Sequence, residues 1–427
     1  IPTGKTVVVE GEATLDPEDA LPVIDLSAEG TANTYYADAA NTFYRFRADV
    51  KGNGKALTCG GLSYTEEDLR IEPKAALVLW YSCLQTSYLP WIQASPVVLS
   101  SVKFKKDGYI YFDTPETFVN GNVVIVAIDK ELGYDQIEAD ADKRITNAEV
   151  LWSWNIVFSE GYDPDAAENW IVKGGYTWMN RDLGALIDPE QAYIGGQLNN
   201  VALASTTGNC YQWGRKDPFM YPSTFQQNSW NQKVQAPATY MSGFEYTEIT
   251  ATSEWEEMMS PEWAAAHPSN YINPLFPQDW DDFPSVSDWS YKDQPNLWGN
   301  RTTTSIDKTT SKSIYDPCPP GWRVPDLESF KGIEYVSSTA PYYVTIRYNG
   351  NATTQIPLGG RYFEIYSQNG TIGTLYTAAP YGWNSDRNYY YFERRGTGIA
   401  FQPQSSTTIT TSDLSRYWAS PVRCIRE

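Results

Sequence analysis

Histidine is almost absent from this chain of 427 residues, which contains only His267. A single imidazole cannot build a metal site from several histidines, and any catalytic triad would have to use this one residue. Because enzymes that move protons near neutral pH usually recruit histidine, its scarcity argues against catalysis. His267 stands near the end of an expected short helix, where a cationic imidazole would favour the helix dipole.

Cysteine, long apolar runs and positive charge are also scarce. The five cysteines form no CxxC pair and are too few for a disulfide-built scaffold, which disfavours a zinc site. No run of about 18 apolar residues occurs, and the first residues do not read as a signal peptide. Acidic residues outnumber basic ones by 52 to 32, and the net charge of −20 argues against nucleic acid and anionic membranes as partners.

Aromatic residues, by contrast, are abundant. Trp, Tyr and Phe make up 15% of the chain and 41% of all residues are hydrophobic, so a large core is expected rather than disorder. The polar composition, rich in Tyr, Trp, Thr, Asn and Gly, is typical of exported β-rich proteins. The length predicts two or three domains.

The first part, residues 1–159, is predicted to be an all-β domain. Short apolar or alternating runs are separated by turns rich in Gly and Asn, such as Lys51-Gly52-Asn53-Gly54. The strand candidate Val150–Phe158 is apolar enough to be covered on both faces. This number of strands in this length suggests a two-sheet β-sandwich. The expected strands are Thr6–Val9, Thr42–Val50, Ala75–Tyr81, Val97–Phe104, Tyr109–Phe112, Val123–Ile128 and Val150–Phe158.

The second part, residues 160–427, is predicted to be an irregular α+β domain with long ordered loops. The boundary is expected between Ser159 and Lys173, where a turn-forming linker follows the last apolar strand. Strands are expected to return in pairs, first Tyr343–Tyr348 with Thr353–Pro357. The other expected elements are short helices at Ser253–Met259, Ser260–Ala266 and Pro325–Phe330 and strands at Tyr389–Glu393, Gly398–Gln402 and Pro421–Ile425.

The acidic cluster Asp279, Asp281, Asp282 and Asp288 could hold calcium, because carboxylates spaced closely on a loop supply oxygen ligands. The neighbouring sequence lacks the Gly and the distal Glu of an EF-hand loop, so a solvated loop is the alternative. Paired carboxylates could also serve glycoside hydrolysis, but no pair stands out among the many acids. We therefore expect no resident cofactor, with calcium left open.

A second candidate site is the aromatic and polar stretch from Tyr381 to Tyr389. Sugars present apolar faces that stack on Trp and Tyr, while Asn and Asp bond their hydroxyls. Trp383, Asn384, Asp386 and Tyr389 combine these groups on an expected loop, and they are the predicted ligand-binding residues. The alternative is that Trp383 packs in the core.

The cysteines suggest a structural disulfide rather than a nucleophile. Cys318 and Cys424 both stand in strand or turn contexts of one expected domain, and export would permit them to pair. A bond between Cys59 and Cys83 is left open. Cys210 would then have no disulfide partner and would be buried as a small hydrophobic residue.

Four ordered motifs resemble a known family. They are similar to the C-terminal domains of surface proteins of Bacteroides-type bacteria, related to the Fibrobacter major paralogous domain, which has a C-type-lectin-like fold. That resemblance covers roughly residues 160–427. The motifs are Tyr176-Thr177-Trp178-Met179-Asn180-Arg181-Asp182-Leu183-Gly184-Ala185, Tyr211-Gln212-Trp213-Gly214-Arg215-Lys216-Asp217-Pro218-Phe219, Tyr315-Asp316-Pro317-Cys318-Pro319-Pro320-Gly321-Trp322-Arg323-Val324-Pro325 and Pro421-Val422-Arg423-Cys424-Ile425.

The first part resembles the β-sandwich, fimbrillin-like or transthyretin-like, that precedes this domain in fimbrillin-type proteins. The similarity lies in Leu26–Tyr35 and Leu151–Asn155, although members often have Cys where Thr34 stands and His where Asn155 stands. The resemblance implies a fimbrial subunit or tip adhesin, exported by a lipoprotein route and joined to other pilus subunits by strand exchange. The lipidated Cys of a mature terminus is absent, so the chain is expected either to be trimmed or to begin after processing.

The lectin-like fold does not by itself imply sugar binding. Calcium-dependent members use a Glu-Pro-Asn or Gln-Pro-Asp tripeptide with a Trp-Asn-Asp strand. Here Gln402-Pro403-Gln404 and Trp383-Asn384-Ser385 depart from both patterns and stand in reverse order. The leading expectation is therefore a non-enzymatic fimbrial subunit or tip adhesin at the cell surface or outer membrane, binding a host or bacterial glycan or protein. The alternatives are a surface protein for glycan capture without a pilus and a glycan-active hydrolase.

Overall fold

The protein is described here by a computed structural model. It is mostly β-sheet and only 7% helical, which confirms the prediction of a β-rich fold. Six long described segments are 22–59, 62–83, 98–131, 148–173, 311–339 and 409–427. The other described residues are 175–188, 193–194, 197–198, 205–219, 224–226, 233–235, 238–241, 245–249, 255–274, 288–290, 294, 296–300, 343–348, 353–358, 361–363, 365–367, 373–381 and 395–401.

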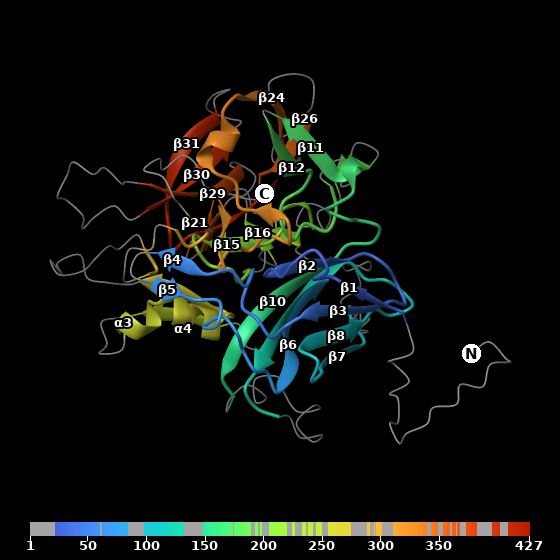
Figure 1. Ribbon diagram of the computed structural model, residues 1–427. Coiled ribbons are helices and arrows are strands. Elements are labelled where there is room, and N and C mark those ends of the chain that lie inside the picture. Colours follow the sequence, from blue (N-terminus) through green and yellow to red (C-terminus); the bar gives the residue numbers. More distant parts are fainter. Residues whose placement is uncertain are drawn as a thin grey trace, which may run out of the picture.

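Two sheets in the first part of the chain pack face to face in a sandwich-like arrangement (Figure 1). One has the order β1-β3-β8-β7, with β1 parallel to β3. The other has the order β18-β6-β9-β10-β2, with β2 parallel to β10. The strands are β1 Val23–Asp25, β2 Thr34–Ala37, β3 Phe43–Arg47, β6 Ala75–Cys83, β7 Ser101–Phe104, β8 Tyr109–Asp113, β9 Gly121–Ile128, β10 Val150–Phe158 and β18 Ala238–Met241.

Strand β10 has the bounds that its apolar run predicts and is covered on both faces. Side chains alternate across a strand, so Trp152, Trp154 and Phe158 enter the core between the two sheets. Ser153 and Val157 point to the opposite face, and both are also buried. Val157 packs with residues of the second part of the chain, so that part supplies the second cover.

Within the described residues, the second part consists mainly of short strands in small sheets, and two short α-helices lie beside β10 and the β4–β5 hairpin (Figure 1). None of the helices in the described segments has the length and apolar character needed to cross a bilayer. The elements in sheets of three or four strands are β11 Trp170–Lys173, β12 Tyr176–Met179, β15 Cys210–Gln212, β23 Trp322–Arg323, β24 Ile333–Thr339, β25 Tyr343–Tyr348, β26 Thr353–Pro357, β27 Arg361–Phe363, β28 Ile365–Ser367, β29 Gly373–Tyr381, β30 Arg395–Phe401, β31 Ile409–Ser415, β32 Ala419–Pro421 and β33 Ile425–Arg426. The remaining elements are β4 Leu57–Cys59, β5 Leu62–Tyr64, β13 Tyr193–Ile194, β14 Gln197–Leu198, β16 Thr224–Gln226, β17 Lys233–Gln235, β19 Glu245–Ile249, β20 Asn270–Pro274, β21 Gly299–Asn300, β22 Ser311–Lys312, α3 Trp255–Met258, α4 Pro261–Ala266, η3 Ala167–Asn169 and η4 Leu327–Phe330.

Among the described residues, local signals in the second part give the expected elements with small differences, while the strand expected at Tyr389–Glu393 lies outside the described residues. Helix α4 begins at Pro261, and the Ser260 side chain accepts from the Trp263 N–H at 3.1 Å, as the cap signal predicts. Strands β25 and β26 pair as expected. The strand expected over Pro421–Ile425 is instead divided between β32 and β33, because Val422, Arg423 and Cys424 leave the ladder.

A single hydrophobic core crosses the boundary expected after residue 159. Tyr35, Trp152 and Trp154 share that core with Ala265 of α4 and with Tyr315. Strand β18, from the second part of the chain, also pairs with β6 and extends the sheet of the first part. The division into residues 1–159 and 160–427 stays a prediction, and the two parts pack on each other extensively.

The cysteines paired in the sequence analysis, Cys318 and Cys424, are bonded in the structure. Their Cα atoms lie 6.1 Å apart across a sequence separation of 106 residues, and both side chains are buried. The side chains of Cys59 and Cys83 lie outside the described residues, while Cys210 is a buried free thiol. The bond ties the end of the chain to the turn before β23.

Removing this bond should destabilise the protein markedly. For a loop of this length, the chain-entropy model gives about 4–5 kcal/mol of stabilisation. A Cys318→Ala/Cys424→Ala variant should therefore lose about that much free energy of unfolding, measured by urea denaturation. The difference from wild type should shrink when both proteins are unfolded under reducing conditions, whereas equal midpoints in oxidising buffer would contradict the structural role.

The close approach of the two parts can be tested at Gly52. Its φ is +53°, and a Cβ there would lie 2.3 Å from the Ile314 carbonyl oxygen of the second part. Gly161, with φ +65°, has open space around its would-be Cβ, so it is a matched control. Gly161→Ala should cost about 1–2 kcal/mol of left-handed strain, and Gly52→Ala should cost clearly more in the same chemical unfolding assay. Equal losses would mean that the contact with Ile314 is not tight in solution.

Candidate functional site

The ligand-binding residues predicted from sequence, Trp383, Asn384, Asp386 and Tyr389, lie outside the described residues. So do Gln402-Pro403-Gln404 and three members of the acidic cluster, Asp279, Asp281 and Asp282. Asp288 is described: it is buried, and its Oδ2 accepts from Arg416 Nη1 at 2.8 Å. This carboxylate therefore neutralises a buried guanidinium. Among the described residues, no group of three or more His, Cys, Asp or Glu side chains forms a metal site.

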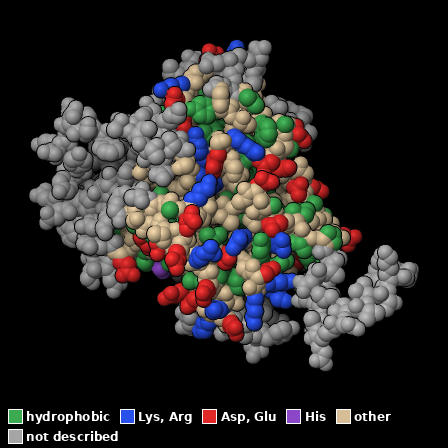
Figure 2. All heavy atoms as spheres, viewed as in Figure 1, with side chains coloured by type: hydrophobic (Ala, Val, Ile, Leu, Met, Phe, Trp, Pro, Cys, Tyr) green, Lys and Arg blue, Asp and Glu red, His purple; other side chains and the backbone are tan. Residues whose placement is uncertain are grey.

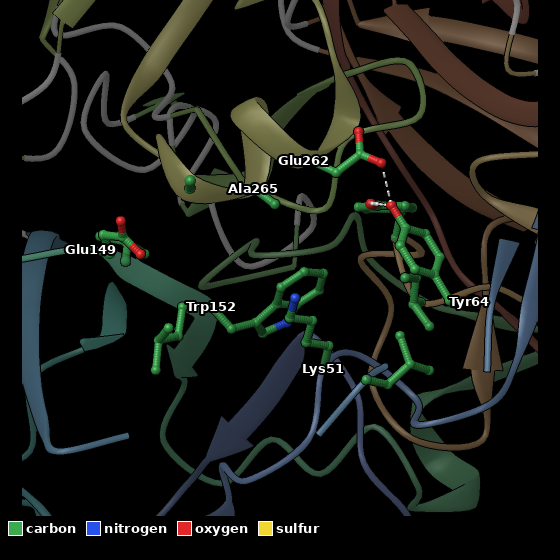
Figure 3. A pocket seen from close by; sticks show the side chains of 12 residues that line it. Lys51, Tyr64, Glu149, Trp152, Glu262 and Ala265 are labelled. Carbon is green, nitrogen blue, oxygen red and sulfur yellow. Dashed lines mark hydrogen bonds between the residues drawn. The ribbon is translucent and has the colours of Figure 1, made fainter. Parts of the chain in front are cut away.

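A pocket opens at the junction of the two parts of the chain (Figure 3). It encloses about 230 Å³ and is bounded by charged and aromatic side chains from both parts. The first part supplies Lys51, Tyr64, Glu149 and Trp152, and the second part supplies Glu262 and Tyr315. We call these six residues the junction pocket.

Local structure positions the side chains of the junction pocket. Lys51 begins a turn in which Gly52 and Gly54 take positive φ values. Glu262 lies in the first turn of α4, held by the Ser260 cap. Glu149 precedes β10, and its backbone N–H donates to Asp129 Oδ1 at 2.8 Å. These elements therefore fix the backbone positions from which the three charged side chains extend.

Hydrogen bonds join several polar groups of the junction pocket. Tyr64 Oη donates to Glu262 Oε1 at 2.5 Å and lies 3.2 Å from Tyr315 Oη. Within the described part of the chain, the Lys51 ammonium makes no hydrogen bond or ion pair, and it lies 5.8 Å from the centroid of the Trp152 ring. Burial lowers the pKa of Lys51, with Glu262 and then Asp68 opposing that effect. A half-buried ammonium of this kind is stabilised when a ligand oxygen accepts a hydrogen bond from it.

The floor of the pocket is held by hydrogen bonds between the two parts. Trp152 Nε1 donates to Asn33 Oδ1 at 2.8 Å. Asn33 Nδ2 in turn donates to the carbonyl oxygens of Ile314 at 2.7 Å and Asp316 at 2.8 Å. Since Trp152 is only 2% exposed, it shapes the pocket more than it offers a stacking surface.

Beneath the pocket lies a buried cluster of Ser153, Lys216 and Asp217. Lys216 Nζ contacts Ser153 Oγ and lies 2.5 Å from Asp217 Oδ1, and the ammonium stands 4.4 Å from the Trp152 ring centroid. Serine beside lysine can form a nucleophile and base. Ser153 is 1% exposed, however, so a substrate cannot reach its oxygen and the cluster serves to join the two parts.

Other reactive residue types also have structural roles. Burial raises the pKa of the Cys210 thiol, which keeps it protonated and unreactive. His267 caps the end of α4: its Nδ1 lies 2.8 Å from the Trp263 carbonyl oxygen, and its ring stacks on Trp263. These arrangements account for both side chains by packing.

The four sequence motifs converge in one buried region of the second part, whose core includes Met179, Trp213, Trp322 and Cys424. Two charged residues of this region have close polar partners. Arg423 Nε donates to Asp182 Oδ1 at 2.7 Å. Lys312, just before the third motif, donates to three carbonyl oxygens, those of Cys318, Pro319 and Trp322. The motifs thus supply the core and its ion pairs, and no ligand is needed to explain them.

The acidic surplus does not collect into one patch on the face seen in Figure 2, where acidic and basic side chains are interspersed. The junction pocket and the Ser153 cluster escaped the sequence analysis because their members stand far apart along the chain. The local sequence signal for the Ser153 cluster is the Arg215-Lys216-Asp217 run within an aromatic motif, and the junction pocket has no such signal.

Comparison with known proteins places the chain in no described group: no protein-family model, no curated protein and no solved structure matches it.

The buried Lys216 makes the stability of the junction depend on pH. Burial lowers its pKa from 10.5 to about 8, with Asp217 opposing that shift. Between these two pH values the unfolded chain binds more protons than the folded one, so the stability contribution of Lys216 rises with pH through this window. Lys216→Met should abolish that rise.

The measurement is the free energy of unfolding of wild type minus that of the variant, followed across the same pH range by urea denaturation. This difference removes the titration of the buried tyrosines, which is common to both proteins. Lys74→Met, at an exposed lysine, should show a flat difference. A flat difference for Lys216→Met as well would show that Lys216 keeps its ordinary pKa.

Proposed function

We propose that this chain is a non-enzymatic binding protein of the bacterial cell surface, a fimbrial subunit or tip adhesin. The observation that carries the proposal is the continuous core between the two parts, reinforced by buried ion pairs and a disulfide near the end of the chain. A protein that holds a cell to a surface must transmit force from its anchor to its ligand. A core that crosses the junction transmits force without a weak linker.

The finer features of this proposal rest on sequence resemblance. They are a fimbrillin-like or transthyretin-like sandwich, a C-type-lectin-like second domain, and export by a lipoprotein route to the fimbrium or outer membrane. Pilus partners joined by strand exchange would need a sheet edge. In the described sheets, β1 and β7 are end strands, and Ile24 of β1 is 46% exposed. An apolar side chain on an end strand favours pairing with a further strand.

Glycan capture without a pilus is the second candidate function, and the junction pocket favours it. Small-molecule sites combine a concave shape with a few convergent polar groups. Lys51, Glu149 and Glu262 meet that description at the junction.

The test is immunogold electron microscopy of the producing bacterium with antibodies against this chain. Gold along filaments is expected, whereas gold on the cell body alone would favour glycan capture, and gold confined to the cell interior would overturn both functions. Ile24→Asp should lower incorporation into filaments because a charge on β1 disfavours strand pairing. Ala28→Asp, which adds the same charge at an exposed turn residue outside the strands, is the control and should incorporate normally.

A further inference from the structure

We propose that the junction pocket binds one neutral pyranose ring of a glycan, held by Lys51 and Glu149 from the first part of the chain and by Glu262 from α4. The inference rests on the proposed binding function and names the site and ligand class for it. It concerns residues other than Trp383, Asn384, Asp386 and Tyr389.

The size of the pocket limits the ligand to one ring. Its volume of about 230 Å³ equals that of about eight water molecules in the liquid. Pockets for drug-sized ligands begin near 300 Å³. A single sugar ring therefore fits, while the rest of a glycan would extend into solvent through the open side.

The charged groups of the pocket match a ring that carries hydroxyls around its perimeter. In Figure 3, Glu149 stands on one side of Trp152, and Glu262 with Tyr64 stands on the other, with Lys51 beside the indole. A hydroxyl can donate to a carboxylate and also accept from an ammonium. A pyranose thus carries a hydrogen-bonding group suited to each of these three side chains.

Other small ligands satisfy fewer of these groups. A zwitterionic amino acid can pair its carboxylate with Lys51 and its ammonium with one glutamate, which leaves the other glutamate without a partner from the ligand. An anion such as phosphate could pair with Lys51 but would face Glu149 and Glu262, whose charges repel it. A neutral ring with several hydroxyls can hydrogen-bond to both carboxylates and to the ammonium without bringing a further charge into the pocket.

Ligand binding here would also strengthen the junction. The ring would contact the turn at Lys51 and helix α4 together, and these come from different parts of the chain. A ligand that binds only the folded state raises its stability by mass action. Binding of a monosaccharide should therefore raise the melting temperature of the whole protein.

The experiment uses the full chain and a panel of methyl glycosides of glucose, galactose, mannose, fucose, N-acetylglucosamine and N-acetylgalactosamine. Saturation-transfer NMR detects contact, and calorimetric titration gives the affinity of the glycosides that bind. Glu262→Gln and Lys51→Met should each weaken binding by about tenfold or more, because each removes a charge-assisted hydrogen bond. Glu257→Gln and Lys74→Met, at exposed positions away from the pocket, should bind as wild type does.

Circular dichroism checks that each variant is folded. If both pocket variants bind as tightly as wild type, the binding site lies elsewhere. That outcome would overturn the inference while leaving a binding function in place. Absence of binding by every glycoside, or tighter binding of glycine or inorganic phosphate than of any glycoside, would also overturn it. The filament labelling described above is independent of these outcomes, so the two proposals can fail separately.

Discussion

The double burial of strand β10 is the constraint on which the rest of the structure depends. A strand with one solvated face needs one partner layer, but Val150–Phe158 offers apolar or small side chains on both faces and must be covered twice. The first cover is the facing sheet, reached through Trp152, Trp154 and Phe158. The second is the remainder of the chain, which meets Ser153 and Val157. The two parts therefore fold against a shared strand, and the positions of α4, Tyr315 and the Lys216 cluster follow from it.

Because both faces of β10 are buried, its polar groups need hydrogen-bond partners. These hydrogen bonds specify how the two parts of the chain pack on each other. Ser153 would be costly to bury alone, and it is satisfied by Lys216 and Asp217, which neutralise each other. Asn33 similarly links Trp152 to two backbone carbonyls of the second part. Buried ion pairs often add little net stability against a hydrophobic alternative, but breaking one is costly. We therefore regard the Lys216–Asp217 pair as a means of fixing the register of the junction, with most of the stability supplied by the aromatic core around it.

Local patterns in the sequence were sufficient for the elements that depend on neighbouring residues. The bounds of β10, the Ser260 cap of α4 and the pairing of β25 with β26 all follow from periodicity, cap chemistry and turn spacing. Pairings between distant segments could not be foreseen in this way. Strand β18 joins β6 across more than a hundred residues of chain, and Asn33 bonds Ile314 across 281. No periodic pattern encodes such contacts, since they depend on which surfaces remain uncovered after the local elements form. The junction pocket belongs to this second kind, which is why its residues were not among those predicted to bind a ligand.

The same reasoning explains why a binding site would form at this junction rather than on the sheets. Sheet faces are filled by interdigitating side chains, whereas the meeting of a turn, a helix and a strand end leaves a space that no single element can fill. Charged side chains at its rim, Lys51, Glu149 and Glu262, remain close to solvent and so avoid the full cost of desolvation. The turn glycines that let the chain approach Ile314 also bring Lys51 to the rim, so the tight packing of the junction and the chemistry of its pocket have a common origin. A substitution that loosens the packing at Gly52 should therefore also displace Lys51, coupling the stability of the junction to its capacity to bind.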